Sequence, residues 1–429
     1  MTQKTKRRIA VVIPNRAPYG RLKPVLRAIK EHPDLELQII VGTPMNLHHM
    51  LFSLRHSQFT SLRKSLPWYI RARAKTLLRR GDVSGHELLA KLVRADGFTI
   101  DRFLPMFLEG GDLATMLKVQ ANVLFSLHSI LAELKPDILL VHADRFEMLP
   151  VAITGAALNI PVAHTQGGDV SGTFDETVRH AITKLAHIHF PTTAKSMERI
   201  VQMGEDPKNV IMTGCPTIDT VSTLDLSTDG IYERNGKGYG DALDFRQPFV
   251  LVLQHPVTSE YAQSKRNMEE VLAAVNEIQM PTLLFWPNID GGTDGASAAV
   301  REFLTTHSVP KLSLYKNFNT DDFYRSLNAA SVAVGNSSSF IREGSYLGTP
   351  AVLVGTRQHL REQAGNLVEV GYERDSIVRA IKECLAHGRY EKSALYGDGK
   401  ASNRIAHTLA TMTLPSTQKV FHDIAVGSN

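Results

Sequence analysis

The strongest chemical signal in the sequence is the segment Asn336-Ser337-Ser338-Ser339-Phe340-Ile341-Arg342-Glu343, which follows an apolar run. A buried strand that ends in small hydroxyl residues at the start of a helix leaves backbone N–H groups free at a positive helix end, where a phosphate group can bind. Glu343, two turns into this helix, can accept hydrogen bonds from ribose hydroxyls, and Arg357 after the next strand can pair with a pyrophosphate. The segment therefore predicts a nucleotide diphosphate site, and a plain helix N-cap is the alternative.

A second group of candidate residues follows other predicted strands. Open parallel sheets bind ligands at the carboxyl ends of their strands, so polar residues at those ends carry more weight than polar residues elsewhere. Carboxylates that converge at one sheet edge differ in pKa and can supply both an acid and a base, although a single carboxylate there is more often a loop cap. The candidates on this basis are Arg16, Asp144, Arg145, Gln166, Asp169, Asp175, Glu176 and His255.

Metal chemistry has weaker support in the sequence. His187 and His189 alternate as a metal-binding pair could, but alternate residues of an apolar strand are more often packed in a core. The only cysteines, Cys215 and Cys384, are far apart and lack metal-type spacing, so neither a disulfide framework nor a zinc site is supported. We predict that the protein needs no metal or redox cofactor.

Short runs rich in Val and Ile alternate with longer amphipathic stretches, which is typical of βαβ units and parallel sheets. The predicted strands are 9–13, 37–41, 137–141, 161–164, 187–190, 249–253, 282–285, 312–315, 332–334 and 351–354. The predicted helices include 112–134, 147–158 and 175–185, and a helical stretch is expected after each strand of the second half. Residues 404–420 also have a helical pattern and could cross back to the first domain.

The length of 429 residues indicates two α/β domains of about 200 residues each. We place the boundary after residues 213–216, which gives a first domain of 1–215, a second domain of 216–400 and a last segment of 401–429. A hydrophobic content of 43% with 21% charged residues is ordinary for a soluble globular protein. The first apolar run stops at Pro14, too short for a signal peptide or a membrane span, so we expect a cytoplasmic protein.

The net charge of +5 comes from one segment. Residues 51–81 hold eight Lys or Arg residues and no Asp or Glu, and the rest of the chain has 40 basic and 43 acidic residues. Nucleic-acid binding by the whole protein is therefore not expected. Residues 51–95 form a basic insertion with aromatic and aliphatic residues among its charges, which could contact an anionic membrane surface or an acidic partner. A solvated basic face over the cleft or at a dimer edge is the simpler alternative.

The motifs as a set resemble one enzyme family. In chain order they are His-Ala-Asp-Arg-Phe-Glu (142–147), Gln-Gly-Gly-Asp-Val-Ser-Gly-Thr-Phe-Asp-Glu-Thr-Val-Arg-His-Ala-Ile-Thr-Lys (166–184), Gln-His-Pro-Val-Thr (254–258) and Gly-Asn-Ser-Ser-Ser (335–339). This order resembles the UDP-N-acetylglucosamine 2-epimerase family, and specifically its hydrolysing branch, which feeds sialic acid synthesis. Pro-Asn-Ile-Asp-Gly-Gly (287–292), Gly-Thr-Arg-Gln (355–358) and Tyr-Gly-Asp-Gly (396–399) add to it. The resemblance covers nearly the whole chain except about residues 51–95.

The resemblance implies two Rossmann-like domains with parallel sheets that face a cleft, a fold of the glycosyltransferase B type. The nucleotide would be held mainly by the second domain, and homodimers are common in the family. The implied nucleotide contacts are Arg16, Arg145, His255, Asn288, Phe318 near the base, Ser337, Ser338, Glu343 and Arg357. Asp144 matches a catalytic carboxylate, and Asp169, Asp175 and Glu176 match other acidic positions of the sugar site, with His255 a further catalytic candidate.

One position departs from the family pattern. The third residue of the His-x-Glu-Gly-Gly or His-x-His-Gly-Gly motif is here Gln166, which cannot exchange a proton. If an acid or base at that position were essential the chain would be inactive, so the carboxylates nearby are expected to take that role. The resemblance implies release of free N-acetylmannosamine and UDP from UDP-N-acetylglucosamine, or from a related UDP or GDP 2-acetamido sugar. A non-hydrolysing epimerase and a binding protein without turnover are the alternatives.

Overall fold

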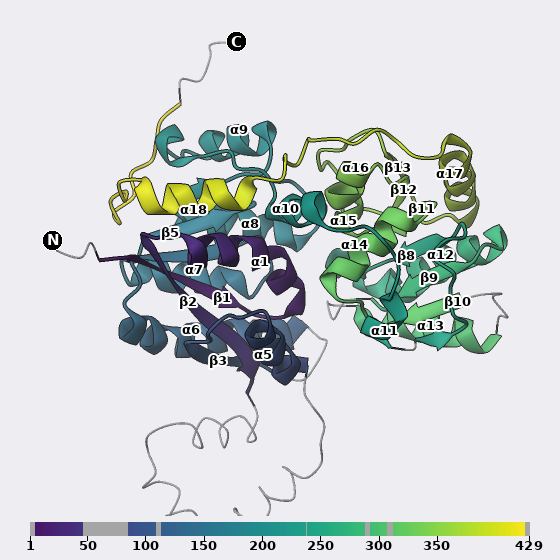
Figure 1. Ribbon diagram of the computed structural model, residues 1–429, viewed down its shortest axis with the longest axis horizontal. Coiled ribbons are helices and arrows are strands. Elements are labelled where there is room, and N and C mark those ends of the chain that lie inside the picture. The colour runs from purple at the N-terminus through teal and green to yellow at the C-terminus, as the bar shows by residue number, and fades with distance from the viewer. Residues whose placement is uncertain are drawn as a thin grey trace, which may run out of the picture.

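The computed structural model describes residues 5–45, 85–108, 113–236, 238–287, 292–306 and 312–424. These residues form two α/β units that stand side by side, each built on its own sheet (Figure 1). Buried runs of Val, Ile and Leu form the central strands of both sheets, as expected for parallel strands that are covered on both faces. The predicted fold class, two Rossmann-like domains of the glycosyltransferase B type, is confirmed.

The first sheet is entirely parallel and has the order β3-β2-β1-β4-β5-β6. This order has a switch point between β1 and β4, where consecutive crossovers run to opposite sides. Ile9 of β1 pairs with Ile138 of β4 there. The strands are β1 (Arg7–Ile13), β2 (Leu35–Pro44), β3 (Arg102–Phe107), β4 (Ile138–His142), β5 (Val162–Thr165) and β6 (Ile188–Phe190).

The second sheet has the order β13-β12-β11-β8-β9-β10-β7 and is parallel except for β7. Its switch point lies between β8 and β11, where Val250 pairs with Val332. The strands are β7 (Tyr239–Gly240), β8 (Val250–Leu253), β9 (Thr282–Phe285), β10 (Leu312–Tyr315), β11 (Val332–Gly335), β12 (Ala351–Val354) and β13 (Leu367–Val370).

Helices cover both faces of each sheet. One face of the first sheet packs against α1 (Arg16–Glu31), α5 (Gly85–Ala95) and α18 (Ala401–Thr411), and the other against α6 (Leu113–Leu134), α7 (Met148–Ala157) and α8 (Phe174–Leu185). One face of the second sheet packs against α12 (Ser264–Ile278), α13 (Thr293–Thr306) and α17 (Arg374–His387). The other face packs against α10 (Pro216–Thr223), α11 (Ile231–Asn235), α14 (Thr320–Ala329), α15 (Ser338–Ile341) and α16 (Glu343–Leu347). The remaining α-helix of the described residues is α9 (Ala194–Gln202).

Two helices tie the units together. The last helix, α18, comes after the second sheet in the chain but lies beside α1 on the first (Figure 1), and its Ile405 and Leu409 share a core with Ile9. Helix α10 contacts α1 and α18 on one side and α14 and α16 on the other. Helix α1 is therefore held against the second unit, and this contact positions the site described below.

The sequence prediction was wrong for several elements. It missed β3, β7 and β13, which lie at or next to the sheet edges and have mixed burial. Residues 404–420 are helical only to Thr411, because Pro415 cannot continue a helix and disfavours it just before. No helix separates β12 from β13.

Most of the predicted basic insertion lies outside the described residues, and only the part from Gly85 onwards is included. There, Leu89 and Val93 of α5 are buried in the core of the first unit. None of the helices in the described ranges combines the length and apolar character that a bilayer span requires.

Candidate active site

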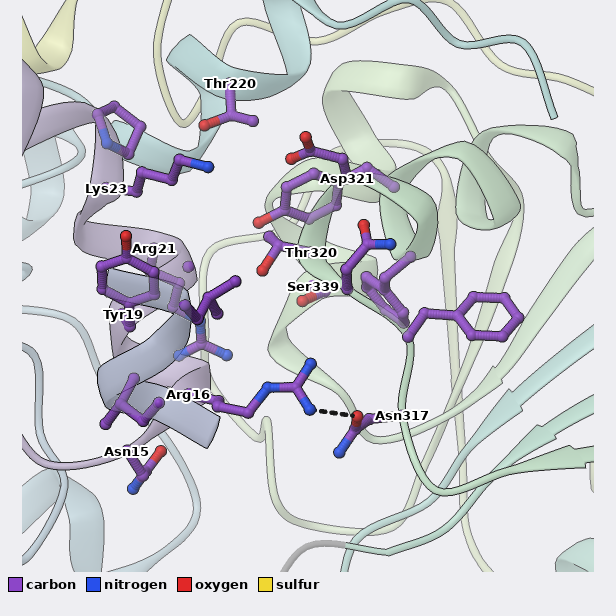
Figure 2. A pocket seen from close by; sticks show the side chains of 18 of the residues that line it. Asn15, Arg16, Tyr19, Arg21, Lys23, Thr220, Asn317, Thr320, Asp321 and Ser339 are labelled. Carbon is purple, nitrogen blue, oxygen red and sulfur yellow. Dashed lines mark hydrogen bonds between the residues drawn. The ribbon is translucent and has the colours of Figure 1, made fainter. Parts of the chain in front are cut away.

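A cleft of about 1650 Å³ lies between α1 of the first unit and the strand ends of the second. Figure 2 shows Arg16, at the start of α1, reaching across this cleft, and its Nη1 donates a hydrogen bond to Asn317 Oδ1 at 3.0 Å. Burial lowers the pKa of Arg16 from its ordinary value, but an arginine remains charged at neutral pH. Both units therefore contribute polar groups to one continuous cavity, large enough for a nucleotide sugar.

The predicted residues that follow strands lie at the two topological switch points. Arg16 follows β1 and Arg145 follows β4, on either side of the first switch point. His255 follows β8 and Ser337 follows β11, on either side of the second. Because ligands of open α/β sheets bind outside the carboxyl ends of strands at these points, the topology explains why all four line the cleft.

The turn after β11 is held by paired backbone and side-chain hydrogen bonds. Asn336 Oδ1 accepts from the backbone N–H of His255 and Asn336 Nδ2 donates to the His255 carbonyl, both at 2.8 Å. Gly335 has φ of 134°, and a side chain there would meet the Leu253 carbonyl oxygen at 2.2 Å. Arg357 Nη1 donates to the Asn336 carbonyl at 3.2 Å. These contacts place His255 and Ser337 next to each other and fix both against movement.

The helix after this turn is kinked, contrary to the prediction of one continuous helix. Ser337 is the N-cap of α15, and its hydroxyl accepts from the backbone N–H of Ser339 at 3.3 Å. The helix is interrupted at Arg342, whose ψ of −68° lies at the limit of the helical region, and α16 starts at Glu343. Arg342 Nη2 donates to Ser338 Oγ at 3.0 Å, so the Ser338 hydroxyl oxygen already accepts a hydrogen bond within the protein.

Glu343 is fully buried, and both of its carboxylate oxygens lack a hydrogen-bond partner in the described structure. Arg342 Nε lies 3.7 Å from Glu343 Oε1, beyond hydrogen-bond distance. A buried carboxylate without partners is costly, and a ligand diol would supply the missing donors. The ribose contact that the sequence predicts for Glu343 stays a prediction, since this side chain is not part of the cleft lining.

One end of the cleft is aromatic. Phe318 lines it and packs edge-on against Phe285 and Tyr315, with ring centroids 5.0 and 4.6 Å away. Such a cluster offers a flat apolar surface of the kind that a nucleobase requires. Asn288, another predicted nucleotide contact, lies outside the described residues.

Asp144 forms an ion pair with Arg179 of α8, in which Arg179 is buried and the Asp144 side chain is 21% exposed. Arg179 Nε donates to Asp144 Oδ2 at 3.0 Å, and Arg179 Nη2 makes a second contact with the same oxygen. Burial by itself would raise the pKa of Asp144, but the charge and hydrogen bonds of Arg179 hold that pKa well below the ordinary range. Asp144 is therefore a carboxylate at every pH at which the protein would work.

Arg145 and Glu147 form a second pair beside Asp144. Arg145 Nε and Nη2 donate to the Glu147 carboxylate at 3.0 to 3.2 Å, and Glu147 is fully buried. The Arg145 side chain is more than a quarter exposed and lines the cleft. Glu147 thus orients Arg145 toward the cavity, as a nucleotide-binding arginine requires.

The structure gives Asp169 a role in joining the two units. Its Oδ1 accepts from Ser196 Oγ at 2.6 Å and from Thr192 Oγ1 at 3.1 Å, and its Oδ2 accepts from Arg361 Nη2 at 2.5 Å. Arg361 follows β12 of the second unit, so this buried pair crosses the interface. Burial would raise the pKa of Asp169, yet Arg361 and Arg179 lower it. This arrangement favours a structural role over the catalytic role that the sequence predicts for Asp169.

Gln166 has φ of 62° and is buried, and its Nε2 donates to Cys215 Sγ at 3.3 Å. It therefore faces the segment between the two units and does not line the cleft. Burial raises the pKa of Cys215, which keeps that thiol protonated. The protonated thiol beside Gln166 therefore does not restore proton exchange at this position.

Asp175 and Glu176 occupy the first turn of α8, which Thr173 caps. Glu176 Oε2 accepts from the backbone N–H of Ser171, and its Oε1 lies 3.7 Å from His180 Nε2. The Glu176 side chain is one-third exposed, so it can still meet a solvent molecule or a substrate. Asp175 and Glu176 lie on the same helix as Arg179, which is the ion-pair partner of Asp144.

The two histidines near Asp144 are uncharged. Burial, together with the charges of Arg21 and Arg342, lowers the pKa of His142 to about 3. A hydrogen bond of 2.8 Å joins His142 Nδ1 to Thr165 Oγ1, while its buried Nε2 lacks a partner. Burial likewise lowers the pKa of His164 to about 3. His142 Nε2 is therefore a neutral, buried nitrogen without a hydrogen-bond partner among the described residues.

Not all predicted residues line the cleft. Those that do are Arg16, Arg145, His255, Phe318 and Ser337, and those that are not part of its lining are Asp144, Gln166, Asp169, Asp175, Glu176, Ser338, Glu343 and Arg357. The sequence prediction overlooked Arg21, which lines the cleft, and the buried arginines Arg342 and Arg361. Arg342 stands directly before Glu343 in an apolar stretch, a signal that could have identified it.

The predicted histidine pair is part of a hydrogen-bonded core. His187 Nδ1 accepts from the backbone N–H of Val162, and His189 Nε2 lies 3.0 Å from Glu205 Oε2. In the ranges that the structure covers, no group of His, Cys, Asp and Glu side chains has a geometry that could hold a metal ion.

The two Rossmann-like units and the cleft between them define a class of protein folds, the glycosyltransferase B type. The sequence profile of the UDP-N-acetylglucosamine 2-epimerase family matches residues 83–410, and the chain belongs to this family.

Two relatives match over nearly their full length. The chain is 30% identical over 410 residues to UDP-N,N'-diacetylbacillosamine 2-epimerase (hydrolyzing) of Legionella pneumophila, covering 96% of this chain and 97% of the relative. It is 28% identical over 415 residues to UDP-N-acetylglucosamine 2-epimerase of Neisseria meningitidis, again covering 96% and 97%. The solved structure of a UDP-GlcNAc 2-epimerase from Neisseria meningitidis bound to UDP-GlcNAc has a similar fold, with a TM-score of 0.71 at 16% identity over 94% of this chain and 99% of that one.

Proposed function

We propose that this chain is a hydrolysing nucleotide-sugar 2-epimerase. It converts UDP-N-acetylglucosamine, or a related UDP or GDP 2-acetamido sugar, into the free nucleoside diphosphate and a free N-acetylmannosamine-type sugar. The observation that carries the proposal is the arrangement of Arg16, His255 and Ser337 around one cleft, together with the ionised and partly exposed Asp144 just after β4. The Legionella relative, whose name includes hydrolysis, supports it over nearly the full chain.

The first half of the reaction is an elimination. The bond between carbon 1 and the diphosphate oxygen breaks, and both of its electrons leave with the nucleotide. Positive charge then develops on the ring and acidifies the proton at carbon 2, so a weak base is sufficient to remove it. Asp144 takes this proton, and the C–H electrons form the double bond of a 2-acetamidoglycal. The low pKa of Asp144 keeps it deprotonated, and Arg179 holds its orientation.

Leaving-group stabilisation is the largest contribution in this scheme. Fixed donors aimed at a developing negative charge often dominate catalysis because they need no reorganisation. Arg16 from the first unit, and His255, Ser337 and Arg357 from the second, are the donors proposed for the departing diphosphate. Their supporting hydrogen bonds run through Asn336 and Asn317, which keeps them in place before the substrate binds.

The second half is a hydration. A water molecule adds its hydroxyl to carbon 1, and carbon 2 receives a proton from the face opposite to the one that lost it. The product is a free sugar with inverted configuration at carbon 2. Asp175 and Glu176, at the exposed start of α8, are the groups proposed to deliver this proton and to activate the water.

A second candidate function is the non-hydrolysing epimerase, which returns the nucleotide to the intermediate. The meningococcal relative, whose name does not include hydrolysis, favours considering it. A nucleotide-sugar binding protein without turnover is the third candidate, and Gln166 is the only argument for it.

Proton NMR in deuterated water distinguishes the three functions. The purified protein is incubated with UDP-N-acetylglucosamine and, in parallel, with GDP and diamino-sugar analogues. We expect free sugar that carries deuterium at carbon 2, together with free nucleoside diphosphate. A deuterated nucleotide sugar would instead identify the non-hydrolysing reaction, and no exchange with any substrate would leave only binding.

A further inference from the structure

Asp322 is a buried carboxylate at which donors from two segments of the second unit meet. It lies in the first turn of α14, and its side chain is fully buried. Arg234 Nε and Nη2 donate to it at 2.7 to 3.0 Å, and Arg325 Nη1 donates to it at 2.7 Å. Asn235 Nδ2 and Asn319 Nδ2 donate to Asp322 Oδ2 at 2.6 and 2.5 Å. We call these five residues the Asp322 cluster.

The stability of the fold does not by itself account for this cluster. Burial would raise the pKa of Asp322, but the hydrogen bonds from Arg234 and Arg325 lower it, so the carboxylate is ionised. Replacing a buried ion pair with apolar side chains of the same volume is often neutral or stabilising. An ion pair with several hydrogen bonds does supply directional contacts, which hold groups in one arrangement. The role of the cluster therefore depends on which groups it holds.

The Asp322 cluster holds the loop that carries Phe318. Asn235 Oδ1 accepts from the backbone N–H of Asn319, directly after Phe318 in the chain, at 2.9 Å. Asn319 Oδ1 accepts from the backbone N–H of Asp322 at 2.9 Å and thereby caps α14. Both the backbone and the side chain of the residue that follows Phe318 are therefore fixed by the cluster.

Helix α11, which supplies Arg234 and Asn235, also supports the ring of Phe318. The carbonyl of Gly236, at the end of α11, accepts from Tyr315 Oη at 3.1 Å. Tyr315 packs against Phe318 with ring centroids 4.6 Å apart. The end of α11 thus holds the aromatic end of the cleft at two points, the loop through Asn235 and the aromatic packing through Gly236.

The same loop faces the first unit through Asn317. Asn317 Oδ1 accepts the hydrogen bond from Arg16 across the cleft (Figure 2). Asn317, Phe318 and Asn319 all line the cleft, whereas the Asp322 side chain does not. A displacement of this loop would therefore move the aromatic surface and the partner of Arg16 together, although Asp322 itself is out of reach of a ligand in the cleft.

We propose that Asp322 is a positioning residue for the nucleobase, which acts by holding residues 317–319 in the arrangement that receives the base. The inference rests on the proposed function, because it takes the aromatic end of the cleft as the base subsite. A loop that is held in its bound arrangement before the ligand arrives loses less conformational entropy on binding. Disruption of the cluster should therefore weaken ligands that contain the base and spare ligands that lack it.

Titration calorimetry with the separate parts of the nucleotide tests this selectivity. The full-length wild type is first titrated with UDP and GDP, and the tighter ligand, its nucleoside and pyrophosphate are then used for each variant. Asp322→Asn removes the charge that pairs with both arginines. Asn235→Ala keeps those ion pairs and removes the acceptor of the Asn319 N–H. We expect both variants to bind the nucleotide and the nucleoside about tenfold more weakly, with pyrophosphate within about threefold of the wild type.

A kinetic measurement on the same variants gives a second readout. Because the base is remote from the bond that breaks, KM for the nucleotide sugar should rise about tenfold while kcat changes less than about threefold. Asp375→Asn, the same change at an exposed position of α17, is the control and should leave all affinities unchanged.

Two results would overturn the inference. Equal weakening of nucleoside and pyrophosphate would show that the variants disturb the second unit as a whole, and unchanged nucleotide affinity would show that the cluster does not set the loop. Thermal melting identifies a misfolded variant, and if Asp322→Asn does not fold, Asn235→Ala decides. A wild type that binds neither UDP nor GDP would overturn the proposed function and this inference with it. Binding without turnover would contradict only the proposed reaction, since the ratio of the affinities still decides the role of Asp322.

Discussion

At the scale of single residues, Asp144 carries the central chemical step of the proposal. Asp144→Asn removes the proton acceptor while its amide oxygen can still accept from Arg179. We expect kcat to fall by about 100-fold or more, which is the contribution of a general base. Turnover of the preferred nucleotide sugar, followed by release of UDP, measures the effect. A variant with near-normal kcat would remove Asp144 from the mechanism and direct attention to Asp175 and Glu176.

Substitution of Glu343 tests the predicted contact with the ribose of the nucleotide. Glu343→Gln replaces a buried carboxylate that lacks partners with a neutral amide of the same size. Hydrogen bonds to charged groups contribute about 1.5–3 kcal/mol, so we expect UDP to bind about tenfold or more weakly. Titration calorimetry with UDP measures the affinity, and Glu383→Gln on the exposed face of α17 is the matched control. Unchanged affinity would exclude Glu343 from the ribose site.

The residues that the sequence could and could not identify differ in one physical respect. Arg16, His255 and Ser337 directly follow central strands, and the rule that ligands bind at strand ends identified them. Asp169 also lies close after a strand, but its bonds to Arg361 and Ser196 depend on the docking of two units, which no local pattern encodes. Arg21 lies within a helix, where strand-end reasoning gives it no weight.

At the scale of elements, burial decided which strands the sequence predicted. Central strands such as β9 and β12 are buried along their whole length and were predicted with their observed bounds. The edge strand β13 has no buried residue, so its composition gives no apolar run to recognise. The same reason applies to β3, in which buried and partly exposed residues are mixed.

The contact between α1 and α14 gives an element-scale prediction. A methyl group at Gly20 would lie 2.2 Å from Thr320 Oγ1 and 3.2 Å from Thr320 Cβ. Alanine normally stabilises a helix by up to about 1 kcal/mol relative to glycine, but here Gly20→Ala should push the two helices apart. We expect the KM for the nucleotide sugar to rise at least about threefold while the fold is retained, since a shift of about 1 Å can cost far more in rate.

A compensating change tests whether that contact is the cause. Thr320→Ala removes the hydroxyl and methyl group that the new side chain would meet, so the double variant should recover most of the lost affinity. Gly365→Ala is the control, because no atom of the described residues would lie within 4 Å of a methyl group added there. A double variant as impaired as Gly20→Ala alone would refute the steric explanation.

The segment after α18, which we call the strap, contacts the first unit through an ion pair between Lys419 and Glu205. This ion pair predicts that the free energy of unfolding depends on pH. Glu205 accepts from Lys184 at 2.7 Å, and Lys419 of the strap contacts it at 2.6 Å. Burial would raise the pKa of Glu205, but His189 and the two lysines lower it to about 2. An unfolded glutamate has a pKa of about 4.3, so its contribution to folding is complete above that pH and is lost as the pH falls toward about 2.

Denaturant unfolding at pH 7 and pH 3 measures this contribution. Glu205→Gln should lower the free energy of unfolding at pH 7, and it should lose less stability than the wild type between pH 7 and pH 3. Glu198→Gln, an exposed position on α9, is the control. Parallel pH profiles for the wild type and Glu205→Gln would contradict the assignment.

At the scale of the whole molecule, the two units meet through several contacts that lie outside the catalytic residues. The backbone N–H of Gly172 donates to the Arg357 carbonyl at 3.3 Å, and Thr193 Oγ1 contacts the Glu362 carboxylate. Together with the Asp169–Arg361 pair, they join the loops after β5 and β6 to the segment after β12. Because Arg357 belongs to this segment, the contacts that close the interface also set the position of Arg357, which is proposed to bind the diphosphate.

The Asp169–Arg361 pair therefore predicts coupling between domain closure and substrate binding. Arg361→Gln leaves Asp169 buried without its counter-charge, a change that costs about 3–5 kcal/mol where the pair is fully buried. We expect the interface to open, with a larger radius of gyration in solution scattering and a KM raised more than kcat is lowered. Asp169→Asn in the same chain removes the unpaired charge and should restore the compact form and much of the substrate affinity. If Arg361→Gln instead lowered kcat alone, at unchanged KM and radius of gyration, the pair would belong to the chemical step and not to the closure of the two units.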